Sequence, residues 1–235
     1  MSIFISLGII LLAMLIQGFL QVTPGVFAIF YHHALGKTTA KKADDQSLSF
    51  ILGTEIATAV FFLITYSIIT FFTTENNFLN STFLWIMAGL FFALSVFTFF
   101  CYFKLGKKNK NTTKLFLTRH TAESFTYHAT HNKNRTDTIV LGFLSTTAEL
   151  VFTLPLFIMS SVEILNLSPR FNFVFIIAYI VVATIPLFTV RTLYRTGHNL
   201  AEIQKLRVKR KTLFRIIISV SYLLLGVLTF ISGVI

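Results

Sequence analysis

Two glutamates lie deep inside long apolar runs of this sequence. Glu55 occurs in the stretch LSFILGTEIATAVFF, and Glu149 occurs in LGFLSTTAELVFTLP. Neither stretch holds a lysine or arginine at a comparable depth that could neutralise the carboxylate. Charged groups inside a bilayer are costly and usually face a cavity or a pathway. Two acidic groups without a basic partner predict binding of a cation or of a proton-coupled solute, with both carboxyl groups taking part in coupling.

Small polar residues flank both glutamates. They are Gly53, Thr54, Thr58, Ser145, Thr146 and Thr147. Hydroxyl groups supply ligands, and glycine lets neighbouring helices approach closely. We therefore expect Ser145, Thr146 and Thr147 to bind the solute together with Glu149. The alternative is that each glutamate is neutral, hydrogen-bonded to a hydroxyl on an adjacent helix such as that of Thr54 or Thr146, and serves packing alone.

The first apolar run contains Thr23, Pro24 and Gly25 in its middle. As one helix this run would be roughly 48 Å long, which exceeds the hydrocarbon core of about 30 Å. Proline removes a backbone donor and clashes with the preceding turn, so the helix is expected to bend here. A loosened backbone can line a substrate cavity. We expect Thr23, Pro24 and Gly25 to bind solute with Glu149; a bent helix that only packs is the alternative.

Two histidines, His32 and His33, follow the expected bend. Imidazole groups bind metal ions and relay protons, so both are candidate metal ligands, together with Glu55 and Glu149. Side chains that only reach toward the headgroups are the alternative. The lone Cys101 excludes an intramolecular disulfide, a paired-thiol redox site and a cysteine-cluster metal site.

Catalysis has little support in the sequence. It contains no GxSxG nucleophile elbow, no HExxH pair and no P-loop. No pattern pairs a nucleophile with a base. We therefore expect a protein without enzymatic activity and without a cofactor.

The elements that carry these residues follow from the composition. The chain has 235 residues, of which 54% are hydrophobic and only 12% charged, whereas soluble domains are about 25% charged. A bilayer crossing needs roughly 20 apolar residues. The runs that reach this length are about 3–34, 47–72, 82–103, 138–165, 171–194 and 212–235. We therefore predict an all-α membrane protein with six transmembrane helices.

The basic residues indicate how the helices are oriented. Of the 20 lysines and arginines, only Arg170 lies in a linker on the second face of the membrane. Basic loops are normally cytoplasmic, so both termini are expected outside a plasma or inner membrane. This rule accounts for the net charge of +11 without a nucleic-acid partner, and it leaves membrane lipid as a partner of the basic loops. Arg191 and Arg195 are expected to anchor the fifth helix at the interface.

A basic cytoplasmic linker at 104–137 divides the chain into a first half, 1–103, and a second half, 138–235. Because each half holds three spans, the halves enter the membrane in opposite senses, as in inverted-repeat transporters. GFLQVT, which begins at Gly18, resembles GFLSTT, which begins at Gly142, at equivalent places in the two halves. The sequence thus predicts two inverted three-helix repeats.

Prolines inside apolar runs predict where these helices are interrupted. They are Pro24, Pro155 and Pro186. Each is expected to kink its helix, with neighbouring hydroxyls or water satisfying the freed carbonyl groups. Because Pro24 and Pro155 lie in the first span of each half, we expect a discontinuous helix in both halves.

The stretch TPGVFAIFYHHALGK, followed by LSFILGTEIATAVFF, resembles the lysine exporter (LysE-like) superfamily of small six-span exporters. Pro24-Gly25, Gly36-Lys37 and Gly53 stand in the places of that family's Pro-Gly motif, short basic linker and glycine-bearing second span. The motifs cover about residues 1–70, and topology alone covers the remainder. The resemblance implies a six-span exporter.

Two departures from the family pattern change the expected substrate. Val26 replaces the proline that often follows Pro-Gly, and Ala148-Glu149 stands where the second half commonly has an Asn-Pro pair. An amino-acid substrate is therefore not expected. Related cadmium, nickel and manganese exporters share the six-span plan, and Glu55 and Glu149 suit a cation better.

The sequence therefore predicts a secondary transporter, an exporter of a small solute or divalent cation that works by alternating access with proton coupling. A non-transporting scaffold or assembly component, whose basic loops recruit other proteins, is the alternative. The scaffold requires Glu55 and Glu149 to be packed without a water path. A homo-oligomer is compatible with either function.

Overall fold

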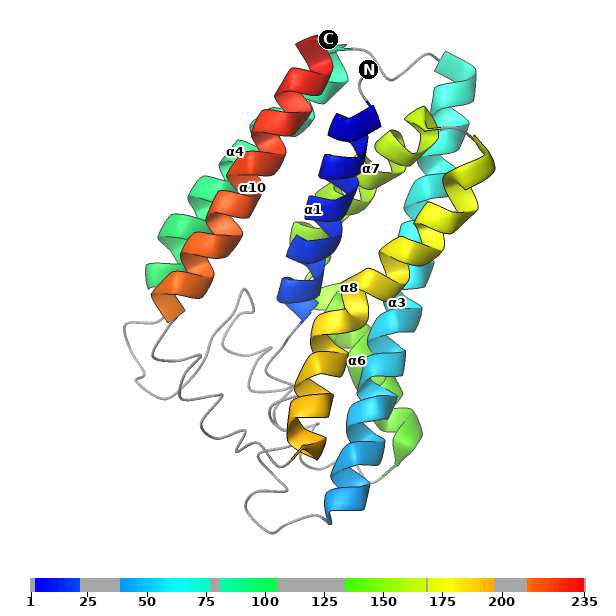
Figure 1. Ribbon diagram of the computed structural model, residues 1–235, viewed down its shortest axis with the longest axis vertical. Helices are drawn as coiled ribbons and strands as arrows, with labels where there is room; N and C mark the ends of the chain where they lie inside the picture. Colours follow the sequence, from blue (N-terminus) through cyan, green and yellow to red (C-terminus); the bar gives the residue numbers. More distant parts are fainter. Residues whose placement is uncertain are drawn as a thin grey trace.

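The computed structural model describes residues 3–21, 39–76, 81–104, 134–167, 169–196 and 211–234, and all regular structure within these ranges is helical. The elements are α1 (Ile3–Gln21), α3 (Ala40–Asn76), α4 (Ser81–Lys104), α6 (Arg135–Ala148), α7 (Leu150–Asn166), the short 3₁₀ helix η1 (Pro169–Phe171), α8 (Asn172–Arg195) and α10 (Lys211–Val234) (Figure 1). The predicted all-α class is confirmed for this part of the chain.

The helices α1, α3, α4, α8 and α10 are each long and apolar enough to cross a bilayer. The bent pair of α6 and α7 brings the number of spans to six if it counts as one. These spans coincide with the predicted apolar runs, although the first run is described only as far as Gln21. This pattern is that of a multi-pass membrane protein.

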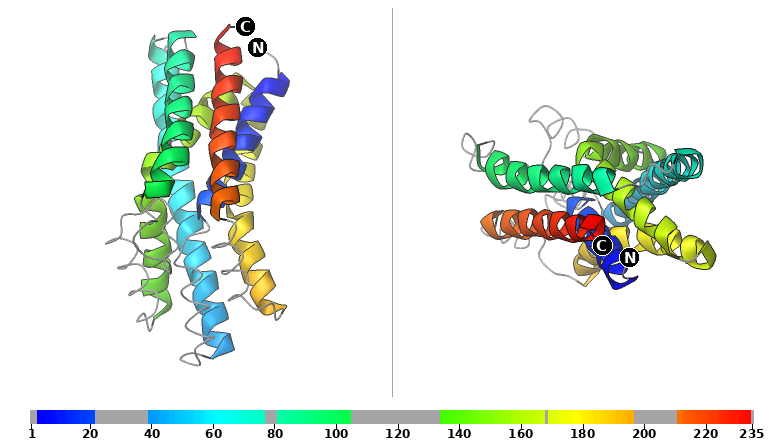
Figure 2. Two further views of the ribbon diagram at one scale, coloured as in Figure 1. Left: turned by 90° about the vertical axis from the view of Figure 1, so that its left-hand side faces the viewer. Right: turned by 90° about the horizontal axis from the view of Figure 1, so that it is seen from above.

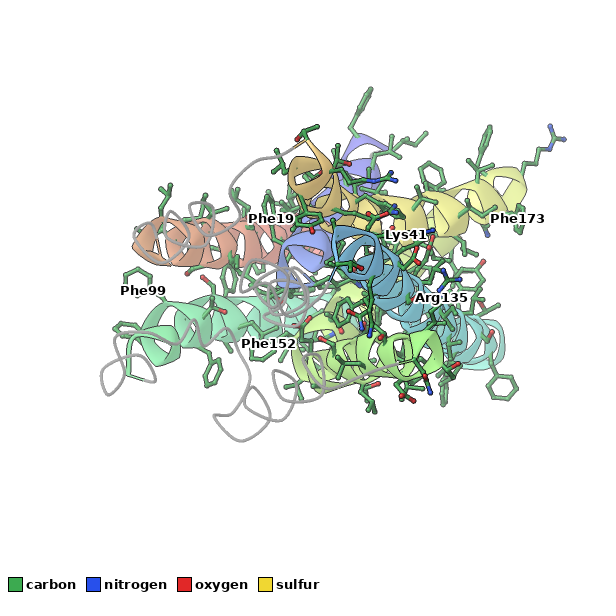
Figure 3. The ribbon with its side chains drawn as sticks, turned by 90° about the horizontal axis from the view of Figure 1, so that it is seen from below. Phe19, Lys41, Phe99, Arg135, Phe152 and Phe173 are labelled. Carbon is green, nitrogen blue, oxygen red and sulfur yellow. The ribbon has the colours of Figure 1, made fainter. Side chains whose placement is uncertain are left out.

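The outer surface of the bundle is apolar. Phe4, Val151 and Phe173 have 85%, 74% and 72% of their surface exposed, and Figure 3 shows Phe173 pointing away from the helices. By contrast, Gln17 and Glu163 are fully buried. Soluble proteins show the opposite arrangement. The exposed apolar side chains therefore face lipid, and the polar groups gather inside.

One aromatic part of the core, which we call the aromatic core, lies where α3, α7 and α8 meet. Phe62 stacks on Tyr179 with ring centroids 4.3 Å apart, and Phe157 meets the two rings edge-on at 5.8 Å and 6.0 Å. All three side chains are fully buried. Such aromatic pairs stabilise a core beyond the burial of area alone, so these contacts hold the three helices together.

The helices pack in three close pairs. α4 packs against α10, α3 against α6, and α1 against α8. Figures 1 and 2 show α4 and α10 together on one side of the bundle, and α1 connects them to the rest because it also contacts α7 and α10. Both chain termini lie at one end of the bundle, and α3 and α6 begin at the opposite end (Figure 1).

Glycines bring the backbones of α3 and α6 into contact. A methyl group on Gly53 would overlap the carbonyl of Ile139, and one on Gly142 would overlap the carbonyl of Phe50. The Oγ1 atom of Thr54 also lies 3.5 Å from the carbonyl oxygen of Gly142. Small residues are the usual means of close helix packing in membranes. This contact fixes α6 against α3.

Candidate functional site

Glu149 is the single residue between α6 and α7, which are bent by 76° relative to each other. Its backbone lies at φ −92° and ψ 0°. The amide of Glu149 donates to the carbonyl of Thr146 at 3.1 Å, and its own carbonyl accepts from the amides of Phe152 at 2.9 Å and Thr153 at 3.1 Å. The chain therefore turns sharply while its polar backbone groups stay paired, as the interior of a bilayer requires.

Local sequence explains a break at this place. The hydroxyls of Thr146 and Thr147 donate to carbonyls one turn earlier at 3.3 Å and 3.0 Å, and such side-chain bonds bend a helix. Pro155, inside α7, has no amide to offer the carbonyl of Val151. Pro155 was the expected interruption of this run, but the bend lies earlier, at Glu149.

The side chain of Glu149 points into the bundle. Only 4% of the residue is exposed, and its carboxyl group lies within electrostatic range of the Tyr222 hydroxyl on α10. Tyr222 is fully buried and donates a hydrogen bond to the carbonyl of Phe152 at 3.1 Å. A carboxyl group therefore sits beside an interrupted backbone and is covered by α10.

Hydrogen-bonded amides and hydroxyls connect α1, α3 and α8 in the interior. The Tyr179 hydroxyl donates to Oε1 of Gln17 at 2.6 Å. Nε2 of Gln21 donates to Oγ1 of Thr58 at 2.6 Å, and Nε2 of Gln17 approaches the same atom at 3.5 Å. The Ser160 hydroxyl of α7 lies beside Tyr179. We call Gln17, Gln21, Thr58, Tyr179 and Ser160 the central polar cluster.

Sequence reasoning missed most of the central polar cluster, although a signal was present. Gln17 and Gln21 are four positions apart in an apolar run, and this spacing places them on one face of a helix. Amides inside a transmembrane helix usually face other helices. The Oε1 atom of Gln21 is buried without a hydrogen-bond partner among the described residues, so it remains available to a ligand.

Glu163 is a second buried carboxyl group on α7, and it was also missed. It is fully buried, and Ser232 of α10 donates to its Oε1 atom at a long distance of 3.5 Å. Its position near the end of the run at 138–165 suggested no burial, because charged side chains there usually reach the headgroups. The packing of α1 against α7 and the contact from Ser232 of α10 cover it instead.

Glu55 lies on the side of α3 that faces α8. Asp44 and Phe62 of α3 both contact α8, through Arg191 and Tyr179. The spacing of an α-helix places Glu55 on the same stripe, between these two contacts. Glu55 is partly buried, so it lies at the border between the interior and the surface.

The remaining predicted solute ligands are divided between two faces. Ser145 and Thr146 are buried, whereas Thr147 is exposed. The hydroxyls of Thr54 and Thr146 donate to the backbone carbonyls of Phe50 and Gly142, at 3.1 Å and 3.3 Å. A hydroxyl has one proton to donate, so neither threonine is a hydrogen-bond donor to a glutamate.

The first-half candidates lie outside the described residues. They are Thr23, Pro24, Gly25, His32 and His33. Among the residues that are described, no three His, Cys, Asp or Glu side chains gather as a metal-ion site. Two of the four candidate metal ligands, Glu55 and Glu149, lie in this part of the chain, and neither belongs to such a group of three side chains.

Ion pairs join the helices at the end opposite the termini. Arg191 of α8 binds Asp44 of α3 through two contacts, Nε to Oδ1 at 2.9 Å and Nη2 to Oδ2 at 3.0 Å. Arg195 lies 3.3 Å from the same carboxylate, and Arg135 of α6 binds Asp45 at 2.7 Å. Figure 3 looks onto this end, with Arg135 labelled. Arg191, which was expected to anchor the interface, is largely buried against Asp44.

Loss of the Asp44 carboxylate is expected to destabilise the bundle more than loss of the Asp45 carboxylate. In Asp44→Asn the Arg191 guanidinium, only 15% exposed, keeps its charge without a partner, which we expect to cost about 1–2 kcal/mol, between an exposed pair and a fully buried one. Asp45→Asn, whose partner Arg135 is 73% exposed, is the matched control. Thermal unfolding of both purified variants in detergent measures the difference; equal melting temperatures would contradict it.

Protein families, curated proteins and solved structures offer no match to this chain.

Proposed function

We propose that the protein is a secondary transporter, an exporter that moves a small solute or divalent cation across the membrane by alternating access with proton coupling. One observation carries this proposal. Glu149 is a buried carboxyl group at the point where a membrane helix is interrupted. Discontinuous helices in transporters bind ions and substrates near the middle of the bilayer, and an ionisable side chain at that place is a functional group by default.

The charges of the interior favour a positively charged ligand. Glu149 and Glu163 are buried, while no lysine, arginine or histidine is buried among the residues for which a side-chain exposure is known. A ligand with a positive charge would neutralise a carboxylate at low dielectric, and an anion would be repelled. The amides and hydroxyls of the central polar cluster can complete the recognition of such a ligand, as polar groups do in other small-molecule sites.

The pairing of the helices supports an inverted repeat. The first helix of each half packs against the second helix of the other half, because α1 contacts α8 and α6 contacts α3. Gly18 of α1 faces Pro186 of α8 closely, and Gly142 of α6 faces Phe50 of α3. Gly18 and Gly142 are the residues that begin the two similar stretches of sequence. The third helices of the halves, α4 and α10, pack against each other.

A reciprocal serine pair supports the same symmetry. The Ser95 hydroxyl donates to the carbonyl of Ser219 at 2.8 Å, and the Ser219 hydroxyl donates to the carbonyl of Ser95 at 2.9 Å. The two serines are 124 residues apart, which is also the difference between positions 142 and 18 of the two glycines. A residue that contacts its own equivalent lies on a two-fold axis. We place the axis that exchanges the halves at this pair.

The same offset relates Gly25 to Glu149. The expected interruption at Thr23-Pro24-Gly25 is therefore the equivalent of the observed break between α6 and α7. In the proposed mechanism, two interrupted helices approach the middle of the membrane from opposite faces, and only the second carries a carboxylate. Rocking of one half against the other would expose Glu149 to each side in turn.

The ion pairs at the basic end take part in this rocking. Asp44 belongs to the first half, whereas Arg191 belongs to the second. In the proposed cycle these pairs hold the halves together at the end that the positive-inside rule assigns to the cytoplasm. They separate when the site opens to that side, while Glu55, on the same stripe of α3, takes part in coupling to protons.

Flux through the purified protein tests the proposed function. Wild-type protein in liposomes, given an imposed pH gradient, is expected to move one member of a panel of divalent cations and cationic solutes saturably, above the leak of protein-free liposomes. Collapse of the pH gradient by a protonophore is expected to stop accumulation. Absence of flux for every member of the panel, with a folded protein by thermal unfolding, would favour the scaffold.

A further inference from the structure

Glu163 lies apart from the solute site. It is 14 positions beyond Glu149 on the same chain segment, which corresponds to roughly 21 Å along α7. It is close to the end of α7 at Asn166. Its neighbours Ser6 of α1 and Ser232 of α10 are near the two chain termini. Glu163 is therefore buried toward the terminal end of the bundle.

Hydroxyls of α1 and α10 and an amide of α7 surround this carboxyl group. The hydroxyls of Ser6 and Ser232 and the side-chain amide of Asn166 donate hydrogen bonds to it, and the contact from Ser232 Oγ to Oε1 is 3.5 Å long. The Oε2 atom is buried and has no hydrogen-bond partner among the described residues. One turn inward on α10, the Thr229 hydroxyl is also buried and unpartnered among them. The Glu163 carboxyl group and the Thr229 hydroxyl are therefore buried and incompletely satisfied within the described part of the chain.

An ionised Glu163 requires a positive partner. No lysine, arginine or histidine is buried among the residues whose side chains the structure describes, and an isolated carboxylate inside a membrane is costly. Among the residues whose burial is described, Glu149 is the other buried carboxyl group, and it lies too far along the segment to share a ligand, so a single positive charge balances the site. Neutral oxygens and one carboxylate are ligands for a hard cation. A proton bound to Glu163 would satisfy one carboxyl oxygen, whereas a cation can contact several of the surrounding oxygen atoms at once.

We propose that the Glu163 carboxylate and the hydroxyl oxygens of Ser6 and Ser232 bind a sodium ion near the terminal end of the bundle. Its role as a second coupling ion rests on the proposed function, whereas its binding does not. The ion would neutralise Glu163 and draw together α1, α7 and α10. No residue of this site belongs to the central polar cluster or to the break at Glu149.

Thermal unfolding of the purified full-length protein tests the site without transport. Sodium chloride is titrated against choline chloride at constant ionic strength, with unfolding followed by the fluorescence of Trp85, the one tryptophan of the chain. A ligand that binds only the folded state raises the melting temperature with concentration. We expect sodium to raise it in wild type and in Asp45→Asn, a surface-carboxylate control, and to have no effect in Glu163→Gln.

Ser232→Ala gives a second, milder test. Removal of one hydroxyl is expected to raise the Kd for sodium about tenfold, as loss of a single supporting group does in other ion sites. Equal melting temperatures in sodium and choline would overturn the proposal, as would an equal effect of potassium or a sodium effect that persists in Glu163→Gln. A melting temperature that follows pH but not sodium would assign the site to a proton. If flux is observed but sodium does not change the melting temperature, the sodium site alone is wrong. If sodium raises the melting temperature but no flux is observed, the proposed transport alone is wrong.

Discussion

We expect the substitution Glu149→Gln to abolish saturable flux while the variant still folds. Glutamine keeps the size and the hydrogen-bonding atoms of the side chain, so the bent pair of α6 and α7 is retained. The negative charge that would balance a bound cation is removed. Leaving a buried charge without its partner costs about 3 kcal/mol or more, which corresponds to a loss of flux of at least about a hundredfold at low substrate.

The measurement is initial flux in proteoliposomes that contain equal amounts of folded protein. Glu149→Asp, which keeps the charge but shortens the side chain, is expected to retain part of the flux. Thr189→Val serves as the control, because Thr189 is an exposed residue of α8 whose hydroxyl bonds only within its helix at 3.0 Å. Wild-type flux in Glu149→Gln would remove this carboxyl group from the mechanism.

Gly142→Ala is expected to prevent correct assembly of the bundle. The added methyl group would overlap the backbone carbonyl of Phe50 on α3, and a backbone atom cannot move aside as a flexible side chain can. Overpacking of this kind costs about 1–3 kcal/mol and occasionally more. Gly53 meets Ile139 in the same way across the same interface. The two helices therefore cannot move apart at Gly142 without also losing the close contact at Gly53.

Gly89→Ala is the matched control for this substitution. An added methyl group on Gly89 would meet nothing within 4 Å, and alanine favours a helix over glycine by about 1 kcal/mol. We therefore expect Gly89→Ala to match or exceed the melting temperature of wild type, while Gly142→Ala elutes as aggregate or melts earlier in size-exclusion and thermal-unfolding measurements. A wild-type profile for Gly142→Ala would mean that α3 and α6 are not in backbone contact.

Much of the architecture could be predicted from the sequence because hydrophobicity decides which segments enter a bilayer. The run that contains Glu55 became α3, and the run that contains Glu149 became the pair of α6 and α7. The inward position of Glu149 also follows from the cost of a charge in lipid. These predictions need only the composition of a segment, and no knowledge of its neighbours.

The features that depend on neighbouring helices could not be predicted in this way. The break lies at Glu149 and not at Pro155, because the Thr146 and Thr147 hydroxyls bond back to the helix and Tyr222 covers the turn. A single sequence does not say which helix covers a glutamate near the end of a run, so Glu163 was missed. Its burial depends on Ser6 and Ser232, from opposite ends of the chain.

Contacts between residues far apart in the sequence could likewise not be predicted. Asp44 and Arg191 are 147 residues apart, and each alone is an ordinary charged residue beside an apolar run. The same holds for Tyr179 and Gln17, which belong to different halves and meet only after the bundle forms. The central polar cluster is therefore a property of the packed helices, although the spacing of Gln17 and Gln21 already placed two of its members on one face.

The length of α3 has a mechanical consequence. It is an uninterrupted helix of 37 residues, about 55 Å long, in a hydrocarbon layer about 30 Å thick. A rod of this length is a lever: a tilt of about ten degrees around one end carries the other sideways by about 10 Å. Around the aromatic core, where Phe62 lies 18 residues or about 27 Å from Asp44, the same tilt moves Asp44 and Asp45 by about 5 Å. This displacement is enough to pull both carboxylates out of reach of their arginines.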